Sequence, residues 1–195
     1  MIRLFAALCK SFLEFLYDDR KYQKAADGYI HNDKGCPHCG AIGMLGLYGG
    51  YSRWLVFRLK GKTNSCLVWV RRFKCESCDA THALLPDVLI PYSPYSLHFK
   101  LTVLIAYFER DCTVVELCEK FGIAVSTLYE WKKRLASHKD LMIGVLSSKM
   151  TPVPEFIRDL IDYDDLSGKL SHFFSKFGFS FMQRMPAPAT LSNPP

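Results

Sequence analysis

The 195-residue sequence lacks the features of a membrane-spanning or secreted protein. None of its apolar runs approaches the roughly 18 residues that a transmembrane helix needs. The apolar run that ends at Leu8 is too short for the core of a signal peptide, and a bulky Leu8 before Cys9 does not suit a lipoprotein cleavage site. We therefore expect a cytoplasmic protein with no membrane partner, where a reducing environment favours metal binding by cysteines over disulfides.

The common catalytic motifs are also missing. The sequence contains no P-loop, no glycine motif for a dinucleotide and no Ser-His-Asp arrangement. Its main acidic cluster, at Asp162, Asp164 and Asp165, is too compact to supply metal ligands from separate strands, so we interpret it as a solvated face. The sequence therefore predicts a protein that is not an enzyme.

Two Cys-x-x-Cys motifs stand among the eight cysteines. Together they offer four thiolates, which fill the tetrahedral shell of a structural zinc ion. Gly40 follows the first motif and suits the positive φ of a metal knuckle, and Asp79, in the same place after the second, tolerates that conformation better than most residues. The 35 residues between the motifs suit a zinc ribbon built on a hairpin. The predicted ligands of this Zn²⁺ are Cys36, Cys39, Cys75 and Cys78.

Other interpretations of these cysteines are weaker. A redox-active dithiol of the thioredoxin type needs βαβ units around the motif, and none is visible. A disulfide framework needs a secreted chain. His82 is a further candidate ligand, but four cysteines complete the shell, so we expect it to be a structural polar residue. The remaining cysteines lack partner spacing and stand among apolar residues, which predicts small buried side chains: Cys9, Cys66, Cys112 and Cys118.

Residues 51–74 contain no acidic side chain, although the net charge of the whole chain is only +6. A one-sided basic ribbon is typical of nucleic-acid binding, because neutralised phosphates supply most of the non-specific affinity. A solvated basic face over an aromatic core is the alternative. The basic residues are Arg53, Arg58, Lys60, Lys62, Arg71, Arg72 and Lys74, and the interleaved aromatic ones are Tyr51, Trp54, Phe57, Trp69 and Phe73.

Apolar spacing predicts the elements of the N-terminal half. Near the N-terminus it predicts an amphipathic helix that ends near Tyr22. Docking of this helix on the rest of the protein is favoured, and docking on a partner or a membrane is the alternative. β-Branched and aromatic residues predict strands at 47–57 and 66–73, with the turn of a hairpin at 60–65. A linker after the hairpin is indicated by three prolines: Pro86, Pro91 and Pro94.

Three helices and a tight turn are predicted next. Apolar spacing gives the first helix at 97–110. Thr113 and Glu116 form a capping box that opens the second helix, and Gly122 ends it because glycine leaves helical geometry at little cost. The third begins at Val125 or Ser126. Apolar residues fall where a helix-turn-helix places its shared core: Leu117, Phe121, Ile123, Leu128 and Trp131, with Cys118 at the small-residue contact.

An ordinary helical pair is the alternative to this helix-turn-helix. The polar face of the third helix favours DNA binding, because a recognition helix presents such side chains to base edges and phosphates in the major groove. The predicted DNA contacts on this helix are Ser126, Thr127, Tyr129, Glu130, Lys132, Lys133 and Arg134.

Further helical stretches are predicted at 141–148, 155–162 and 166–177. Phenylalanines crowd the last one, which is more typical of a core than of a partner groove. The fold class is therefore α+β, with a small β zinc ribbon followed by a mostly helical helix-turn-helix region. The predicted regions are an N-terminal helix at 1–28, the ribbon at 29–90, the helix-turn-helix at 91–140, a helical segment at 141–185 and a disordered Pro-rich tail at 186–195.

Several motifs resemble those of a bacterial family of small zinc-ribbon proteins associated with insertion elements. The matching runs are Cys36-Pro-His-Cys39-Gly40, Tyr48-Gly-Gly-Tyr-Ser-Arg53, Cys75-Glu-Ser-Cys78, Thr81-His-Ala-Leu-Leu-Pro86 and Pro91-Tyr-Ser-Pro-Tyr-Ser96. The tract at 121–131 resembles the helix-turn-helix of transposases and of their accessory DNA-binding proteins. The resemblance covers roughly residues 35–134 and implies a role in DNA binding, with double-stranded DNA and a transposase as candidate partners.

A complete transposase of the common type carries three carboxylates that hold two metal ions. The about 60 residues after the helix-turn-helix provide no core for them. We therefore predict an accessory or regulatory DNA-binding protein. Two other classes stay open: an RNA-binding zinc ribbon in which Trp54, Phe57 and Trp69 stack on bases, and a protein-interaction scaffold that uses the Phe-rich segment.

Overall fold

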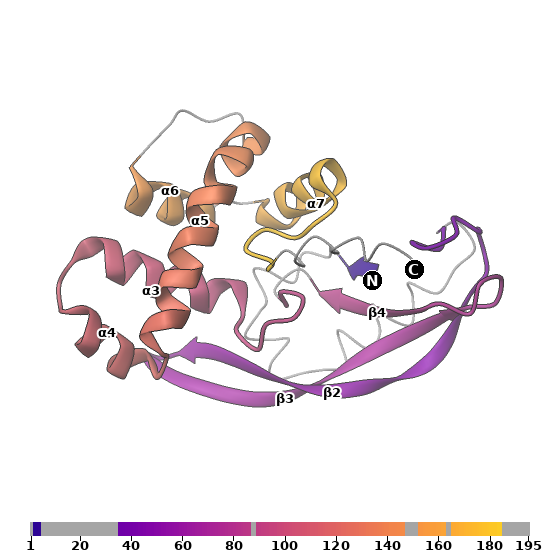
Figure 1. Cartoon of the computed structure of the whole chain (residues 1–195), viewed down its shortest axis with the longest axis horizontal. Coiled ribbons are helices and arrows are strands. Elements are labelled where there is room, and N and C mark those ends of the chain that lie inside the picture. Colours follow the sequence, from indigo (N-terminus) through magenta and orange to yellow (C-terminus); the bar gives the residue numbers. More distant parts are fainter. Residues whose placement is uncertain (1, 5–34, 87–88, 147–151, 163–164, 185–195) are drawn as a thin grey trace, which may run out of the picture.

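The computed structural model describes residues 2–4, 35–86, 89–146, 152–162 and 165–184. Within these residues the chain forms a four-stranded sheet and five helices, which confirms the predicted α+β class. A long hairpin runs along one side of the molecule, the helices gather over one of its ends, and the segment that holds the first cysteine motif lies at the other end (Figure 1).

The hairpin consists of β2 (Leu45–Leu59) and β3 (Lys62–Cys75). Its turn is Lys60-Gly61, where φ is 48° and 75°. Two central residues with positive φ are typical of a type I′ turn, whose twist matches that of the strands it joins. Both strands exceed the predicted 47–57 and 66–73, because most of the polar stretch predicted as turn pairs across the hairpin instead.

Two further strands extend the sheet. β4 (Thr81–Pro86) pairs antiparallel with β3, and β1 (Ile2–Leu4) pairs parallel with β4. The sequence pattern predicted a linker from Pro86 onward but no strand before it. It also placed Ile2–Leu4 in a helix, which is wrong, because these residues pair with a strand about eighty positions away and local apolar spacing does not reveal such a partner. The rest of the predicted helix lies outside the described residues.

The first two of the central helices begin at capping side chains, and the signals predicted for the second of them are confirmed. In α3 (Leu97–Glu109) the Oγ of Ser96 accepts a hydrogen bond from the backbone N–H of Phe99. Thr113 and Glu116 form the capping box of α4 (Val114–Phe121), and Gly122 ends it with φ of 66°. α5 (Val125–Leu146) is longer than predicted. It includes residues 141–146 of the separate helix predicted at 141–148, because no proline follows Asp140 in this stretch and Gly144 keeps to the helix.

The C-terminal segment closes the helical core. α6 (Val153–Ile161) and α7 (Leu166–Phe177) follow α5, and Phe173 and Phe181 are buried in the same apolar cluster as Trp131. The interpretation of the Phe-rich segment as core is therefore confirmed for these side chains. These two of the five phenylalanines of the segment are therefore not available as a binding surface for a partner. The predicted tail at 186–195 lies outside the described residues.

The tip of the hairpin packs against the helices and does not project freely. Thr63 at the start of β3 donates from Oγ1 to the main-chain oxygen of Phe121 at 3.3 Å. The guanidinium carbon of Arg58 lies 4.4 Å from the centre of the Phe121 ring. The hairpin thus bridges the cysteine motifs at its base and α4 at its tip, a span of about 45 Å for a strand of this length.

Candidate metal centre and basic surfaces

The two cysteine motifs fold into matching turns at the base of the hairpin. The backbone N–H of Gly40 donates to the oxygen of Cys36 at 2.8 Å, and that of Asp79 donates to the oxygen of Cys75 at 2.9 Å. Both closing residues have positive φ, 77° for Gly40 and 58° for Asp79. The sequence predicted positive φ at both positions, and this is confirmed. Each turn therefore directs two thiols to the same side of its loop.

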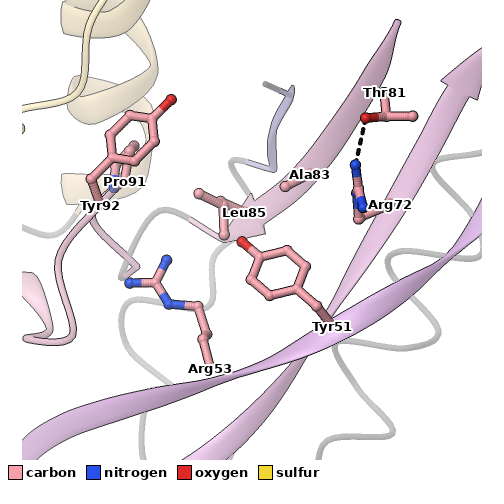
Figure 2. A pocket seen from close by; sticks show the side chains of 8 residues that line it. All are labelled: Tyr51, Arg53, Arg72, Thr81, Ala83, Leu85, Pro91 and Tyr92. Atoms are coloured by element: carbon pink, nitrogen blue, oxygen red, sulfur yellow. Dashed lines mark hydrogen bonds between the residues drawn. The ribbon is translucent and has the colours of Figure 1, made fainter. Parts of the chain in front are cut away.

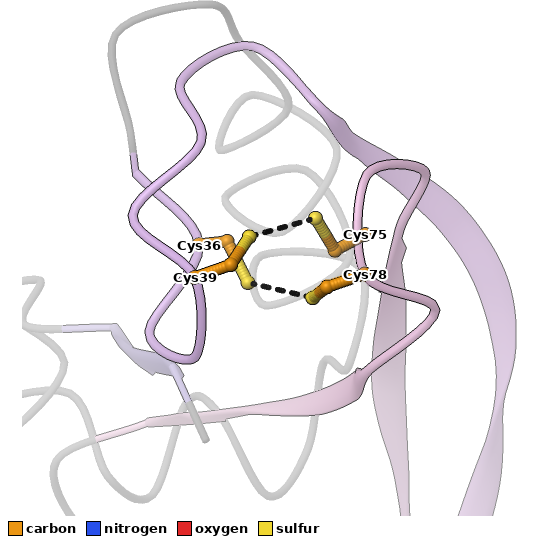
Figure 3. A group of neighbouring side chains, drawn as sticks. All are labelled: Cys36, Cys39, Cys75 and Cys78. Atoms are coloured by element: carbon orange, nitrogen blue, oxygen red, sulfur yellow. Dashed lines mark hydrogen bonds between the residues drawn. The ribbon is translucent and has the colours of Figure 1, made fainter.

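The four thiols meet at one point (Figure 3). The sulfurs of Cys36, Cys39, Cys75 and Cys78 all lie within 4.8 Å of one another. Cys36 and Cys78 are separated by 3.8 Å, and Cys39 and Cys75 by 3.7 Å. A tetrahedral ion with metal–sulfur bonds of about 2.3 Å places its ligands about 3.8 Å apart. The cluster therefore fits a four-coordinate metal ion, and these distances exclude disulfides between the cysteines.

The pKa values of the thiols in the cluster also favour the binding of a cation. Burial raises the pKa of Cys36, but hydrogen bonds from the backbone N–H groups of Cys39 and His38 and from His82 outweigh it, so the pKa falls to about 5. The backbone of Ala80 lowers the pKa of Cys78, but burial and the neighbouring sulfurs raise it to about 12. The thiolate form of Cys36 is thus stable, whereas the neighbouring sulfurs disfavour a thiolate at Cys78. A bound cation would stabilise both thiolates, so metal binding and proton release are coupled.

His82 borders this cluster. From the sequence it was a candidate ligand, and a structural polar residue was favoured because four cysteines complete the shell. The side chain projects from β4, is buried, and places Nε2 3.2 Å from the Sγ of Cys36. A histidine N–H that donates to a thiolate stabilises its charge. The sequence signal that could have placed His82 near the metal was its position four residues after Cys78, in a run that is otherwise mostly apolar.

The basic residues of the hairpin do not form one uniform face. Lys60 and Lys62 are exposed at the tip. Arg58 stacks on Phe121, and Lys74 forms an ion pair of 2.7 Å with Asp79. Arg53 donates to the main-chain oxygens of Ile90 and Ser93, Arg72 donates to Thr81, and Arg71 is half-buried. Among the basic residues of the hairpin that were predicted to contact phosphate, Lys60 and Lys62 at the tip are therefore the most accessible.

The interleaved aromatic residues divide between the core and the surface. Phe57 and Phe73 are buried, with 7% and 1% of their surface exposed. Trp54 and Trp69 are 55% and 44% exposed on the same face of the hairpin, because Trp54 pairs with Leu67, two residues before Trp69. Phe57 is therefore unable to stack on a nucleobase, whereas the two tryptophans are accessible.

The predicted contacts on α5 are also of two kinds. Four of them are exposed on the helix surface: Ser126, Tyr129, Glu130 and Lys133. The other three are partly buried: Thr127, Lys132 and Arg134. Lys132 donates to the hydroxyl of Tyr107 at 2.9 Å, and Arg134 pairs with Glu130 at 2.7 Å while donating to the oxygen of Gln183. The predicted core beneath them is confirmed, since Leu117, Phe121, Ile123, Leu128, Trp131 and Cys118 are all buried.

The cysteines outside the cluster do not all match their prediction. Cys118 is buried and Cys66 is half-buried, and burial raises the pKa of both thiols. Cys112 is exposed, so its interpretation as a buried apolar side chain is wrong. It stands in the loop between α3 and α4, where the polar neighbours Arg110 and Asp111 keep the chain at the surface. Cys9 lies outside the described residues.

A family model described as a domain of unknown function (DUF6431) matches residues 36–131. The match begins at Cys36 and ends at Trp131, so it covers both cysteine motifs, the hairpin, α3, α4 and the first part of α5. No curated protein and no solved structure matches the chain. Across the described residues, none of the helices combines the length and the hydropathy needed to span a membrane.

Proposed function

We propose that this chain is a zinc-dependent DNA-binding protein that joins a zinc ribbon to a helix-turn-helix. The metal would be Zn²⁺, because four cysteine thiolates at tetrahedral spacing are its usual structural site. Two knuckles at the base of a hairpin are the arrangement of a ribbon. Since all four positions are taken by protein ligands, the ion would stabilise the fold and would not act on a substrate.

The α4–α5 pair supports the DNA-binding part. Gly122 turns the chain between the two helices, and Leu128 and Trp131 bury one side of α5 against α3 and α4. The opposite side presents Tyr129 and Lys133 to solvent. A second helix that is anchored on one face and polar on the other suits insertion into a major groove.

The observation that carries the proposal is the contact between the hairpin tip and α4. Thr63 and Arg58 hold the tip against Phe121, the last residue of α4. The exposed Lys60 and Lys62 are therefore fixed beside the turn that leads into α5. Phosphate contacts from these lysines would fix the position of the helix on the duplex, while the side chains of α5 read the bases.

The test is duplex binding as a function of salt. Replacing Lys60 and Lys62 with alanine should weaken binding to all sequences and lower the slope of log K against log salt by about two units. Lys176→Ala removes the same kind of charge from α7 and should leave the slope unchanged. Equal slopes for the wild type, the Lys60/Lys62 double variant and Lys176→Ala would reject the hairpin tip as a phosphate contact.

Base reading is tested separately on α5. Lys133→Ala should change the sequences selected from random duplex DNA, at about 1–3 kcal/mol per lost base contact, with little effect on melting. Glu130→Gln is a less direct variant, because Glu130 also holds Arg134. A uniform loss of affinity for every sequence in Lys133→Ala would assign this lysine to phosphate and not to bases.

The proposed biological setting is an accessory or regulatory role in transposition, in the cytoplasm, without a catalytic core. The support for this setting is the motif resemblance at residues 35–134. A transposase gene beside this one, flanked by terminal inverted repeats, is the expected observation. A conserved position among unrelated operons with no such neighbours would instead favour a transcriptional regulator.

A single-stranded nucleic acid is the second candidate ligand, and one observation favours it. Trp54 and Trp69 expose their rings on one face of the hairpin, and base–aromatic stacking contributes about 1–3 kcal/mol per base. If this face is the binding surface, the double variant Trp54→Ala/Trp69→Ala should lose single-strand affinity while duplex affinity stays unchanged. Tighter binding to duplex than to RNA or DNA single strands would reject it.

A further inference from the structure

A pocket of about 320 Å³ opens between the sheet and the loop that follows β4 (Figure 2). Its walls carry two arginines, Arg53 and Arg72, and two tyrosines, Tyr51 and Tyr92, while Ala83 and Leu85 line it from β4. None of the described lining residues is acidic. A volume above about 300 Å³ with an apolar wall and a few convergent polar groups is typical of a small-molecule site.

The two guanidinium groups are held in place by contacts that leave donors unused. Arg53 donates from one terminal nitrogen to the oxygens of Ile90 and Ser93. Arg72 donates from one terminal nitrogen to the hydroxyl of Thr81. Each guanidinium carries five N–H donors, so further donors are available to an anion. Burial lowers the pKa of Arg53, and a negative charge in the pocket would offset that desolvation.

Tyr92 stands at the rim of this pocket in an unusual conformation. Its φ is 58°, in the left-handed region that aromatic side chains rarely occupy. The side chain is nevertheless 84% exposed, so burial of the ring does not compensate the backbone strain. Strained residues concentrate at ligand sites, where the surrounding structure fixes them. The loop therefore presents an aromatic ring to solvent at the rim of the pocket.

We propose that this pocket binds a single nucleotide, with its phosphate on Arg72 and its base toward the opposite end of the pocket, against Tyr51 and Tyr92. A guanidinium suits phosphate oxygens, and an aromatic ring suits the planar face of any base. A phosphate alone would make no use of the rings or the apolar wall. A free mononucleotide and the 5′-phosphorylated end of a strand share this chemistry. The site lies apart from the hairpin tip and α5, so it does not depend on the proposed duplex binding.

The test uses the full-length, metal-loaded chain and calorimetric titration with adenosine 5′-monophosphate, adenosine and inorganic phosphate. The monophosphate should bind saturably and more tightly than either of its parts. Arg72→Ala should weaken its binding about tenfold, because charge-assisted hydrogen bonds to the phosphate are lost. Arg72→Lys should recover part of the affinity, and Lys176→Ala should match the wild type.

Tyr92→Asn separates the base from the phosphate. Asparagine accepts the left-handed backbone but removes the ring, so affinity for the monophosphate should fall while affinity for inorganic phosphate stays unchanged. Because Tyr92 is exposed, this variant should keep the fold even if Arg72→Ala does not. Melting curves of both variants check this point.

Competition identifies the source of the nucleotide. A 5′-phosphorylated single strand that displaces the monophosphate, when the unphosphorylated strand does not, assigns the site to a strand end. Failure of both strands to compete assigns it to a free nucleotide. The proposal is overturned if no saturable binding of the monophosphate occurs, or if Arg72→Ala and Tyr92→Asn bind it as the wild type does. Duplex binding by Tyr92→Asn should not change, because Tyr92 is not among the predicted DNA contacts, and this keeps the test independent of the α5 proposal.

Discussion

His82 places its Nε2 3.2 Å from the Sγ of Cys36, and both side chains are almost fully buried. The contact joins β4 to the first cysteine motif, 46 residues earlier in the chain. With a metal bound, the ring N–H would donate to a thiolate ligand and share its negative charge. His82 would therefore act as a positioning residue for the centre rather than as a ligand.

The first prediction follows from this contact. His82→Ala should lower metal affinity by about 10–100-fold, the usual effect of losing a group that supports a metal ligand. His38→Ala is the matched control, because His38 sits inside the first motif but its side chain is exposed. Competition with a chromophoric chelator measures both affinities. Equal losses in the two variants would show that His82 has no specific role.

The second prediction concerns the cluster itself. Cys75→Ser should reduce metal content and unfold the hairpin base, because metal binding and folding are coupled when the ligands come from separate loops. Cys112→Ser changes an exposed cysteine outside the cluster and should keep both metal and fold. Metal analysis and circular dichroism give the two readouts. A full complement of metal in Cys75→Ser with a native spectrum would contradict the assignment.

The third prediction separates two tryptophans by burial. Trp131 is 3% exposed, and its ring meets Tyr95 at 4.8 Å and Phe99 at 6.2 Å between centroids. Trp131→Ala should therefore lower the free energy of unfolding by about 3–5 kcal/mol. Trp54→Ala removes the same side chain from an exposed position and should cost much less. Urea denaturation measures both, and similar losses would mean that Trp131 is not a core residue.

The fourth prediction is a loss of stability in acid. Burial, and then the charge of Arg134, lower the pKa of His138 from its ordinary value of 6.5 to about 4. Its Nδ1 accepts a hydrogen bond from the backbone N–H of Met182. Between pH 6.5 and 4 the unfolded chain binds a proton that the folded chain does not, so stability falls as pH falls, by up to about 1.4 kcal/mol per unit from this group.

The check on His138 is a comparison of slopes. Asn at this position can still accept from Met182 but does not titrate, so His138→Asn should show a shallower dependence of unfolding free energy on pH in that window. The stability that His138 contributes is complete above its unfolded pKa and is lost as the pH falls through about 4. Identical slopes for the wild type and the variant would exclude His138 as the cause of the acid sensitivity.

Local chemistry accounts for the features that the sequence predicted correctly. The capping box at Thr113, the turn at Gly122 and the positive φ after each cysteine motif depend on residues within a few positions of one another. The spacing within each motif likewise fixes which thiols share a turn. Apolar spacing in α4 placed Leu117 and Phe121 in the core, because one helical face is set by residues three and four apart.

The sequence by itself therefore determined the hairpin, the central helices, the four clustered cysteines and the helical core. Only the tertiary structure decided which distant segments these elements contact. The pairing of Ile2–Leu4 with β4, the approach of His82 to Cys36 and the packing of Arg58 on Phe121 join segments that no local pattern connects. The sequence around a basic side chain does not distinguish whether that side chain faces solvent, stacks on a ring or lines a pocket. Its role is decided by which distant surface folds against it, and that depends on burial of apolar area summed over the whole chain.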